Sequence, residues 1–148
     1  MKLKTLVLPV AALLGAALLF TQSGCSTFGK SKSNADALQG KWQGSGQNNG
    51  RMSACTFVIS GKTFDFRDMN TNIWYTGIFS LREDVSPKQF IATIVDCPGR
   101  QYVGKTSLCL YKLENGTLTI SGNEPGNPNA PAGFDDPNAA RFELRKGQ

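Results

Sequence analysis

The sequence Leu38-Gln39-Gly40-Lys41-Trp42-Gln43 marks the start of the folded domain, after a polar linker. Gly40 permits a close backbone approach that a side chain would block. Trp42 supplies a large apolar ring whose N–H can still reach a backbone carbonyl. The residues before this stretch indicate where the protein is sent, and the residues after it indicate its architecture.

Alternating apolar and polar residues, separated by turn signals, predict eight short strands after this start. Tight turns connect them, except for the first loop and a long Pro, Gly and Asn-rich loop near the end. Nearest-neighbour pairing needs only such turns, so we expect an all-β, eight-stranded antiparallel up-and-down barrel over residues 38–148 rather than a Greek-key sandwich. The predicted strands are 40–46, 55–60, 63–67, 73–82, 89–96, 102–113, 117–121 and 140–146.

The predicted inner face is crowded with aromatic residues. An eight-stranded barrel is only just wide enough for its own side chains, so we expect a largely filled interior. The alternative is a pocket for a small apolar ligand, as in a lipocalin-type carrier. Its possible lining residues are Phe57, Phe79, Phe90 and Tyr111.

Residues 1–24 are typical of a signal peptide, with a basic start at Lys2 and Lys4 followed by an apolar run from Leu6 to Phe20. The run is shorter than the roughly 20 residues of a membrane-spanning helix. Residues 21–25, Thr-Gln-Ser-Gly-Cys, resemble the lipobox of bacterial lipoproteins, which implies acylation of Cys25; the alternative is an ordinary cleaved secretory signal. Residues 25–37 then form the lipidated Cys and a flexible tether.

The order of several short motifs along residues 38–146 resembles a small, uncharacterised lipocalin-like domain of planctomycete-type bacteria. In lipocalins the Gly-x-Trp opening closes the barrel floor, which implies this role for Gly40 and Trp42, with Arg145 or Lys146 of the last strand approaching the indole ring. Ala130 stands where the family usually has Arg. The matching pieces are 38–42, 61–64, 77–81, 87–90, 110–118, 125–128 and 142–146.

Composition argues against several function classes. The formal charge of +5 includes two leader lysines and is spread thinly, so we expect no nucleic-acid partner. The chain has no His, which removes the usual zinc sites and His-based triads, and we expect no metal, cofactor or catalytic residue. A carboxylate-dependent hydrolase remains a third hypothesis, although the adjacent acidic residues fall at predicted turns. These pairs are Asp65 with Asp68, Glu83 with Asp84, and Asp135 with Asp136.

The cysteines outside the leader lie in an exported, oxidising context. Cys55 and Cys97 fall at the same rim of the barrel, which favours a disulfide between them; the rival pairing is Cys55 with Cys109.

Trp74 falls on the outward side of its strand. It is a candidate partner contact, unless the tether or a loop covers it.

These features predict a lipid-anchored envelope protein whose barrel is a non-catalytic binding or structural module. The resemblance of Ser26 to a sorting residue favours the outer membrane, facing the periplasm. The expected partners are the membrane, through Cys25, and an envelope protein or a small apolar ligand.

Overall fold

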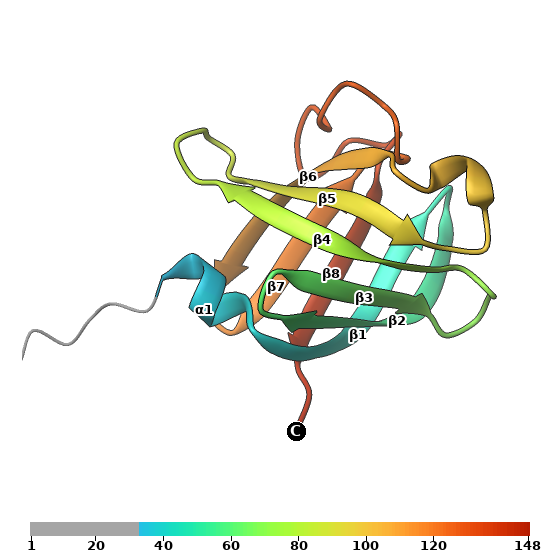
Figure 1. Cartoon of the computed structure of the whole chain (residues 1–148). Coiled ribbons are helices and arrows are strands. Elements are labelled where there is room, and N and C mark those ends of the chain that lie inside the picture. Colours follow the sequence, from blue (N-terminus) through green and yellow to red (C-terminus); the bar gives the residue numbers. More distant parts are fainter. Residues whose placement is uncertain (1–32) are drawn as a thin grey trace, which may run out of the picture. The chain divides into compact units, whose positions relative to one another are not determined.

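A closed barrel of eight antiparallel strands forms the folded domain (Figure 1). The computed structural model describes residues 33–148, so the predicted leader, the acylation site Cys25 and most of the tether lie outside the described residues. The elements are, in order, α1 (Asn34–Leu38), β1 (Gly40–Asn48), β2 (Arg51–Ser60), β3 (Thr63–Asp68), β4 (Trp74–Arg82), β5 (Gln89–Asp96), the 3-10 helix η1 (Arg100–Tyr102), β6 (Thr106–Glu114), β7 (Thr117–Gly122) and β8 (Ala140–Lys146).

Each strand pairs with the next one along the chain, and β8 closes the ring by pairing antiparallel with β1. This confirms the predicted eight-stranded up-and-down barrel. The bounds of β5 and β8 agree with the sequence-based prediction. Strand β6 begins at Thr106 instead of residue 102, because Arg100–Tyr102 form η1 and Gly104 then turns with a φ of 79°.

The last part of the predicted tether is folded as α1. Ser33 caps this helix by accepting a hydrogen bond from the Asp36 N–H at 3.2 Å. Gln39 then fixes the β2–β3 turn, because its side chain accepts a hydrogen bond from the Gly61 N–H at 2.7 Å and donates one to the Gly61 carbonyl at 3.1 Å. With Leu38 buried as well, these contacts order the chain. The prediction of a tether is therefore wrong for residues 34–37.

The two ends of the barrel differ. The β2–β3, β4–β5 and β6–β7 turns share one end with α1, which we call the closed end. The β1–β2, β3–β4, β5–β6 and β7–β8 loops surround the other end, which we call the mouth. Figure 1 shows α1 on one side of the barrel, and η1 with the β3–β4 loop on the opposite side.

Trp42 packs inside the closed end. Its side chain is 1% exposed, and its Nε1 donates a hydrogen bond to the Leu38 carbonyl at 2.8 Å. Gly40, two residues earlier, has a φ of 111°, which other residues rarely adopt. Of the two cations expected near the indole, Lys146 is the one in contact, with Nζ 5.2 Å from the ring centroid. Arg145 directly precedes Lys146 on β8, so its side chain points to the outer face instead.

Candidate ligand-binding cavity

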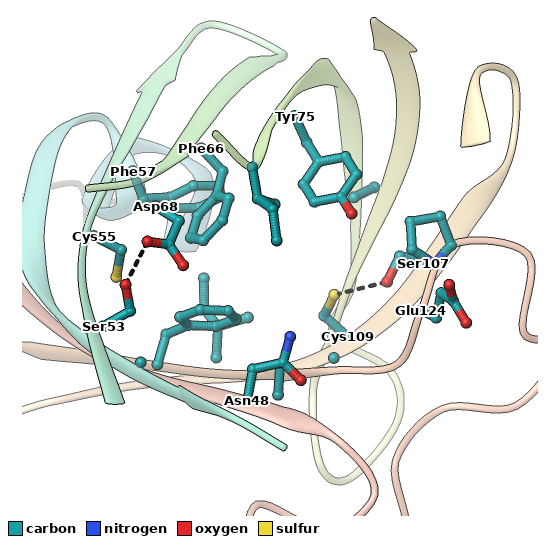
Figure 2. A pocket seen from close by; sticks show the side chains of 18 of the residues that line it. Asn48, Ser53, Cys55, Phe57, Phe66, Asp68, Tyr75, Ser107, Cys109 and Glu124 are labelled. Carbon is teal, nitrogen blue, oxygen red and sulfur yellow. Dashed lines mark hydrogen bonds between the residues drawn. The ribbon is translucent and has the colours of Figure 1, made fainter. Parts of the chain in front are cut away.

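The mouth half of the barrel holds a cavity of about 950 Å³ (Figure 2). Known ligand pockets have volumes of roughly 300–1,000 Å³, so this space is large enough for a small molecule. The prediction of a largely filled interior is wrong for this half. The closed half is filled, with Leu38, Trp42 and Leu118 each at most 1% exposed.

The cavity exists because small side chains occupy inward positions in the mouth half of four strands. Gly46, Ser107, Gly122 and Ala140 occupy such positions on four different strands, and all four line the cavity. The alternation of side chains along a strand also places these residues on the inner face in the sequence. Their small size near the mouth is the signal that sequence reasoning misses.

An aromatic cluster forms the floor of the cavity. The Phe90 ring lies 5.7 Å from Phe57 and 6.1 Å from Phe64, measured between ring centroids, and all three line the cavity. Two of the four predicted lining residues, Phe57 and Phe90, are thus in place. The prediction is wrong for Phe79, which stacks under the floor on Phe90 at 4.5 Å, and for Tyr111, whose hydroxyl donates to Glu83 at 3.2 Å near the closed end. Both are too close to the closed end to line the space.

A second group of aromatic rings lines the upper wall. Phe66 and Phe142 pack edge to face at 5.0 Å, and Tyr75 lies 6.4 Å from Phe66 and 6.3 Å from Tyr102. The wall is apolar over most of its surface. Its other apolar lining residues include Ile73, Ala92, Ile94, Ile120 and Leu144.

Polar side chains line the cavity near the mouth, as Figure 2 shows for Asn48, Ser53, Asp68 and Glu124. The Asp68 carboxylate accepts hydrogen bonds from the Ser53 hydroxyl and from the N–H groups of Asn70, at 2.8 Å, and Thr71, at 3.1 Å. Partial burial raises the pKa of Asp68, but these hydrogen bonds outweigh it and hold the pKa below the usual value. Asp68 is therefore an ionised group built into the rim.

Glu124 occupies another part of the rim, where its carboxylate accepts a hydrogen bond from the Tyr102 hydroxyl. Burial raises the pKa of the neighbouring Tyr75, with smaller contributions from the charges of Cys97 and Glu124. Tyr75 is thus neutral at ordinary pH, and Tyr102 lies beside it. They present ring faces and hydroxyl groups to the cavity.

The three cysteines of the described chain are free thiols, so neither predicted disulfide is present. Cys55 lies on β2 and Cys109 on β6, four strands apart in a ring of eight, so the cavity separates them (Figure 2). Cys97 points into its own loop, where its Sγ donates to the Gly99 carbonyl at 3.0 Å. These positions contradict both the Cys55 with Cys97 pairing and its rival.

The two thiols in the cavity are poor nucleophiles. Burial raises the pKa of Cys55 to about 11, and the charge of Asp68 adds to the effect. Burial also raises the pKa of Cys109 to about 11, although a hydrogen bond with Ser107, at 3.4 Å, opposes it. Because the thiolate is the reactive form, both residues act as small lining groups.

The adjacent carboxylates considered for hydrolysis do not share a site. Asp65 lies on the outer face and pairs with Arg67 at 2.9 Å, whereas Asp68 lines the cavity. Within residues 33–148, no group of three or more His, Cys, Asp or Glu side chains is placed to hold a metal ion. The remaining pairs serve local contacts: Glu83 with Tyr111, Asp84 with Arg82, Asp135 with Arg141, and Asp136 with the Ala132 and Asn138 N–H groups.

Trp74, the candidate partner contact, lies on the outer wall next to Arg67, to which it is paired across β3 and β4. The Arg67 guanidinium lies 5.8 Å from the Trp74 ring centroid, and the indole is only partly exposed. Neither the described part of the tether nor a long loop is needed to cover it. The ring is therefore not part of the cavity.

Comparisons with protein-family models, with curated proteins and with solved structures found no match to this chain. In the described part of the chain, no helix has the length and apolar character needed to cross a bilayer. The cavity itself is thus the feature from which a function can be argued.

Proposed function

We propose that this barrel binds a small, mostly apolar molecule and belongs to an exported lipoprotein held at the membrane through acyl chains on Cys25. The observation that carries the proposal is the 950 Å³ cavity with its aromatic floor. It favours a lipocalin-type carrier over a module that acts only through its outer face. The proposal includes no catalytic step.

The chemistry of the lining supports an amphipathic ligand. The floor offers the faces and edges of Phe57, Phe64 and Phe90, with no charged side chain among them. Burial of apolar ligand surface against such a floor supplies roughly 25 cal/mol per Å² of favourable free energy. The charged side chains of the lining, Arg51, Asp68 and Glu124, all lie near the mouth, where Asn48 and Ser53 add hydrogen-bonding groups. A ligand with an apolar body and a polar end fits this gradient, with the body inserted first.

The proposed cellular location is inferred from the N-terminal leader sequence. The basic start, the apolar run and the lipobox-like residues before Cys25 support export and acylation, and dual acylation gives stable anchoring. The lipocalin-like resemblance agrees with the barrel topology. We accordingly assign the protein to the cell envelope, at the outer membrane.

Native mass spectrometry of the full-length protein, purified from its own membranes, tests the proposal. We expect a releasable small-molecule adduct on the folded protein and acyl chains on the Cys25 peptide. The Ala92→Phe variant fills the cavity from β5 and should lose the adduct. Its neighbour Ile91 faces outward, so Ile91→Phe is the matched control and should keep it. Folded wild-type protein without an adduct, or an adduct retained equally by Ala92→Phe, would exclude the carrier function.

A further inference from the structure

The charged side chains that line the cavity are two carboxylates and one guanidinium. The carboxylates belong to Asp68, at the end of β3, and Glu124, in the β7–β8 loop, and the guanidinium belongs to Arg51, at the start of β2. A molecule inside the cavity therefore meets an excess of negative charge. Four further charged residues of the loops around the mouth do not line the cavity: Arg100, Lys105, Asp135 and Asp136.

The two carboxylates are held in place, whereas the guanidinium is not. Asp68 accepts three hydrogen bonds within its own turn, and Glu124 accepts one from the Tyr102 hydroxyl. Arg51 is exposed and forms no ion pair with any residue in 33–148, so its long side chain is free to turn toward water. Groups that are ordered before a ligand arrives lose less entropy on binding. The carboxylates are thus the charged groups best prepared to hold a ligand.

The second oxygen of Asp68 faces the cavity. The hydrogen bonds from the Ser53 hydroxyl and from the Asn70 and Thr71 N–H groups all end on Oδ1. Figure 2 shows the other oxygen turned away from Ser53 and toward the interior. An ionised carboxylate only accepts hydrogen bonds, so the group that it favours is a cation or an N–H donor.

Aromatic rings connect the two carboxylates along the cavity wall. Phe66 lies two residues before Asp68 on β3, and its ring centroid is 6.4 Å from that of Tyr75. The Tyr75 ring lies in turn 6.3 Å from Tyr102, whose hydroxyl donates to Glu124. The face of an aromatic ring carries negative potential, which attracts a cation and disfavours an anion. The wall that accommodates an apolar body thus also favours a positive charge.

We propose that the cavity selects apolar molecules that carry one ammonium group, held near the mouth by Asp68 and the aromatic wall. The apolar body then reaches the floor at Phe57 and Phe90. Glu124 adds negative charge at the other end of the aromatic wall. The inference rests on the proposed function, that the cavity binds a small molecule, and adds the sign of the ligand's charge.

A ligand with an anionic end is the competing possibility. Arg51 is the only cation in the lining of the described chain, so it alone would attract such a group, whereas Asp68 and Glu124 would repel it. The aromatic faces between the two carboxylates would add to the repulsion. A neutral polar end would lose the charge-assisted hydrogen bond to Asp68. The lining therefore ranks the three kinds of ligand.

Isothermal titration calorimetry of the full-length lipoprotein in lipid nanodiscs, with empty nanodiscs as the blank, tests this ranking. The probes phenylbutylamine, phenylbutanol and phenylvalerate share a phenylbutyl body and end, at neutral pH, in an ammonium, a hydroxyl and a carboxylate. We expect phenylbutylamine to bind most tightly and phenylvalerate most weakly. The cavity-filling variant Ala92→Phe should lose binding of all three probes.

Variants of single carboxylates locate the ammonium group. Asp68→Asn should weaken the binding of phenylbutylamine roughly tenfold, because a hydrogen bond to a charged group is lost. Unchanged binding of phenylbutanol by this variant shows that its cavity is intact. Glu124→Gln should weaken phenylbutylamine by a smaller factor. Asp96→Asn is the matched control and should leave all three affinities unchanged, since Asp96 is an exposed carboxylate at the mouth end of β5 that does not line the cavity.

Equal affinities for the three probes overturn the inference and leave the carrier function standing. Tighter binding of phenylvalerate that Arg51→Gln abolishes also overturns it, because the polar end is then an anion. Equal weakening of phenylbutylamine by Asp96→Asn and Asp68→Asn indicates a general field instead of a contact, which contradicts the assignment to Asp68. If Asp68→Asn does not fold, an unchanged affinity of Glu124→Gln for phenylbutylamine overturns the inference. Failure of all three probes to bind overturns it as well, and the native mass spectrometry then decides the carrier function separately.

Discussion

The indole of Trp42 both fills the closed end of the barrel and satisfies a buried carbonyl, that of Leu38, at 2.8 Å. Trp42→Phe removes this hydrogen bond and leaves unfilled space, so we expect a loss of about 2–4 kcal/mol in the free energy of unfolding. Trp74 is the matched control because it is partly exposed on the outer wall. Trp74→Phe should cost less than about 1 kcal/mol. Urea unfolding followed by circular dichroism measures both, and equal losses would contradict the role of Trp42.

The pairing of strands depends on how closely their backbones approach as well as on their side chains. In β1, Gly44 lies against the backbone of β8. A Cβ at this position would lie 2.0 Å from the Glu143 carbonyl oxygen, which belongs to the paired strand and cannot swing away. Gly44→Ala should therefore strain the junction that closes the ring and lower the free energy of unfolding by about 1–3 kcal/mol. Gly133 lies in the β7–β8 loop, where an added Cβ would meet no atom within 4 Å. Gly133→Ala should stay within about 0.5 kcal/mol of wild type in the same urea titration, and similar losses in both variants would rule out the close approach as the cause.

The β3–β4 connection carries a pH dependence through Asp68. Its pKa is lower in the folded state than in the unfolded chain, because hydrogen bonds from Ser53, Asn70 and Thr71 outweigh the effect of burial. Its contribution to stability is therefore fully present above the unfolded pKa and is lost as the pH falls through the folded pKa. We expect Asp68→Asn to be less stable than wild type near neutral pH, with the difference shrinking below about pH 4.

Denaturant titrations of both proteins across this pH range measure the effect. Asp84→Asn is the control, since Asp84 sits at the closed end with a side chain that is 77% exposed and its cation, Arg82, at 3.9 Å. Its stability should follow that of wild type at every pH. If the difference in the free energy of unfolding between wild type and Asp68→Asn stays constant with pH, the hydrogen bonds of this turn do not depend on the negative charge of Asp68.

At the scale of the whole molecule, the alternation of side chains is enough to predict the ring of eight strands. The period of two and the turn signals are local, so the sequence alone assigns residues such as Phe57 and Phe90 to the inner face. Depth along the barrel axis is not local, because it depends on strand tilt and register. For this reason the alternation wrongly assigns Phe79 and Tyr111 to the pocket and does not reveal the space near the mouth.

The same limitation explains the wrong disulfide prediction. Cys55 and Cys109 share the inner face, but only the closed ring shows that β2 and β6 stand on opposite sides of it. The alternation of side chains along a strand predicts which face of the sheet a thiol occupies. It does not predict the distance between two thiols across the barrel. The exported context favours oxidation, yet it cannot join thiols that the fold keeps apart.

The stability of the barrel thus comes from noncovalent closure of the ring, because β8 pairs with β1 and the described chain contains no covalent cross-link. We expect a reductant to leave the urea unfolding curve unchanged, and alkylation of denatured, unreduced protein to modify Cys55, Cys97 and Cys109, the cysteines of the described chain. A bridge between Cys55 and Cys97 would instead stabilise by about 3–4 kcal/mol, which reduction would remove. Cys97→Ala is the matched control, since it cannot form that bridge. A reductant that destabilises wild type but not Cys97→Ala would show that the ring needs a covalent bond.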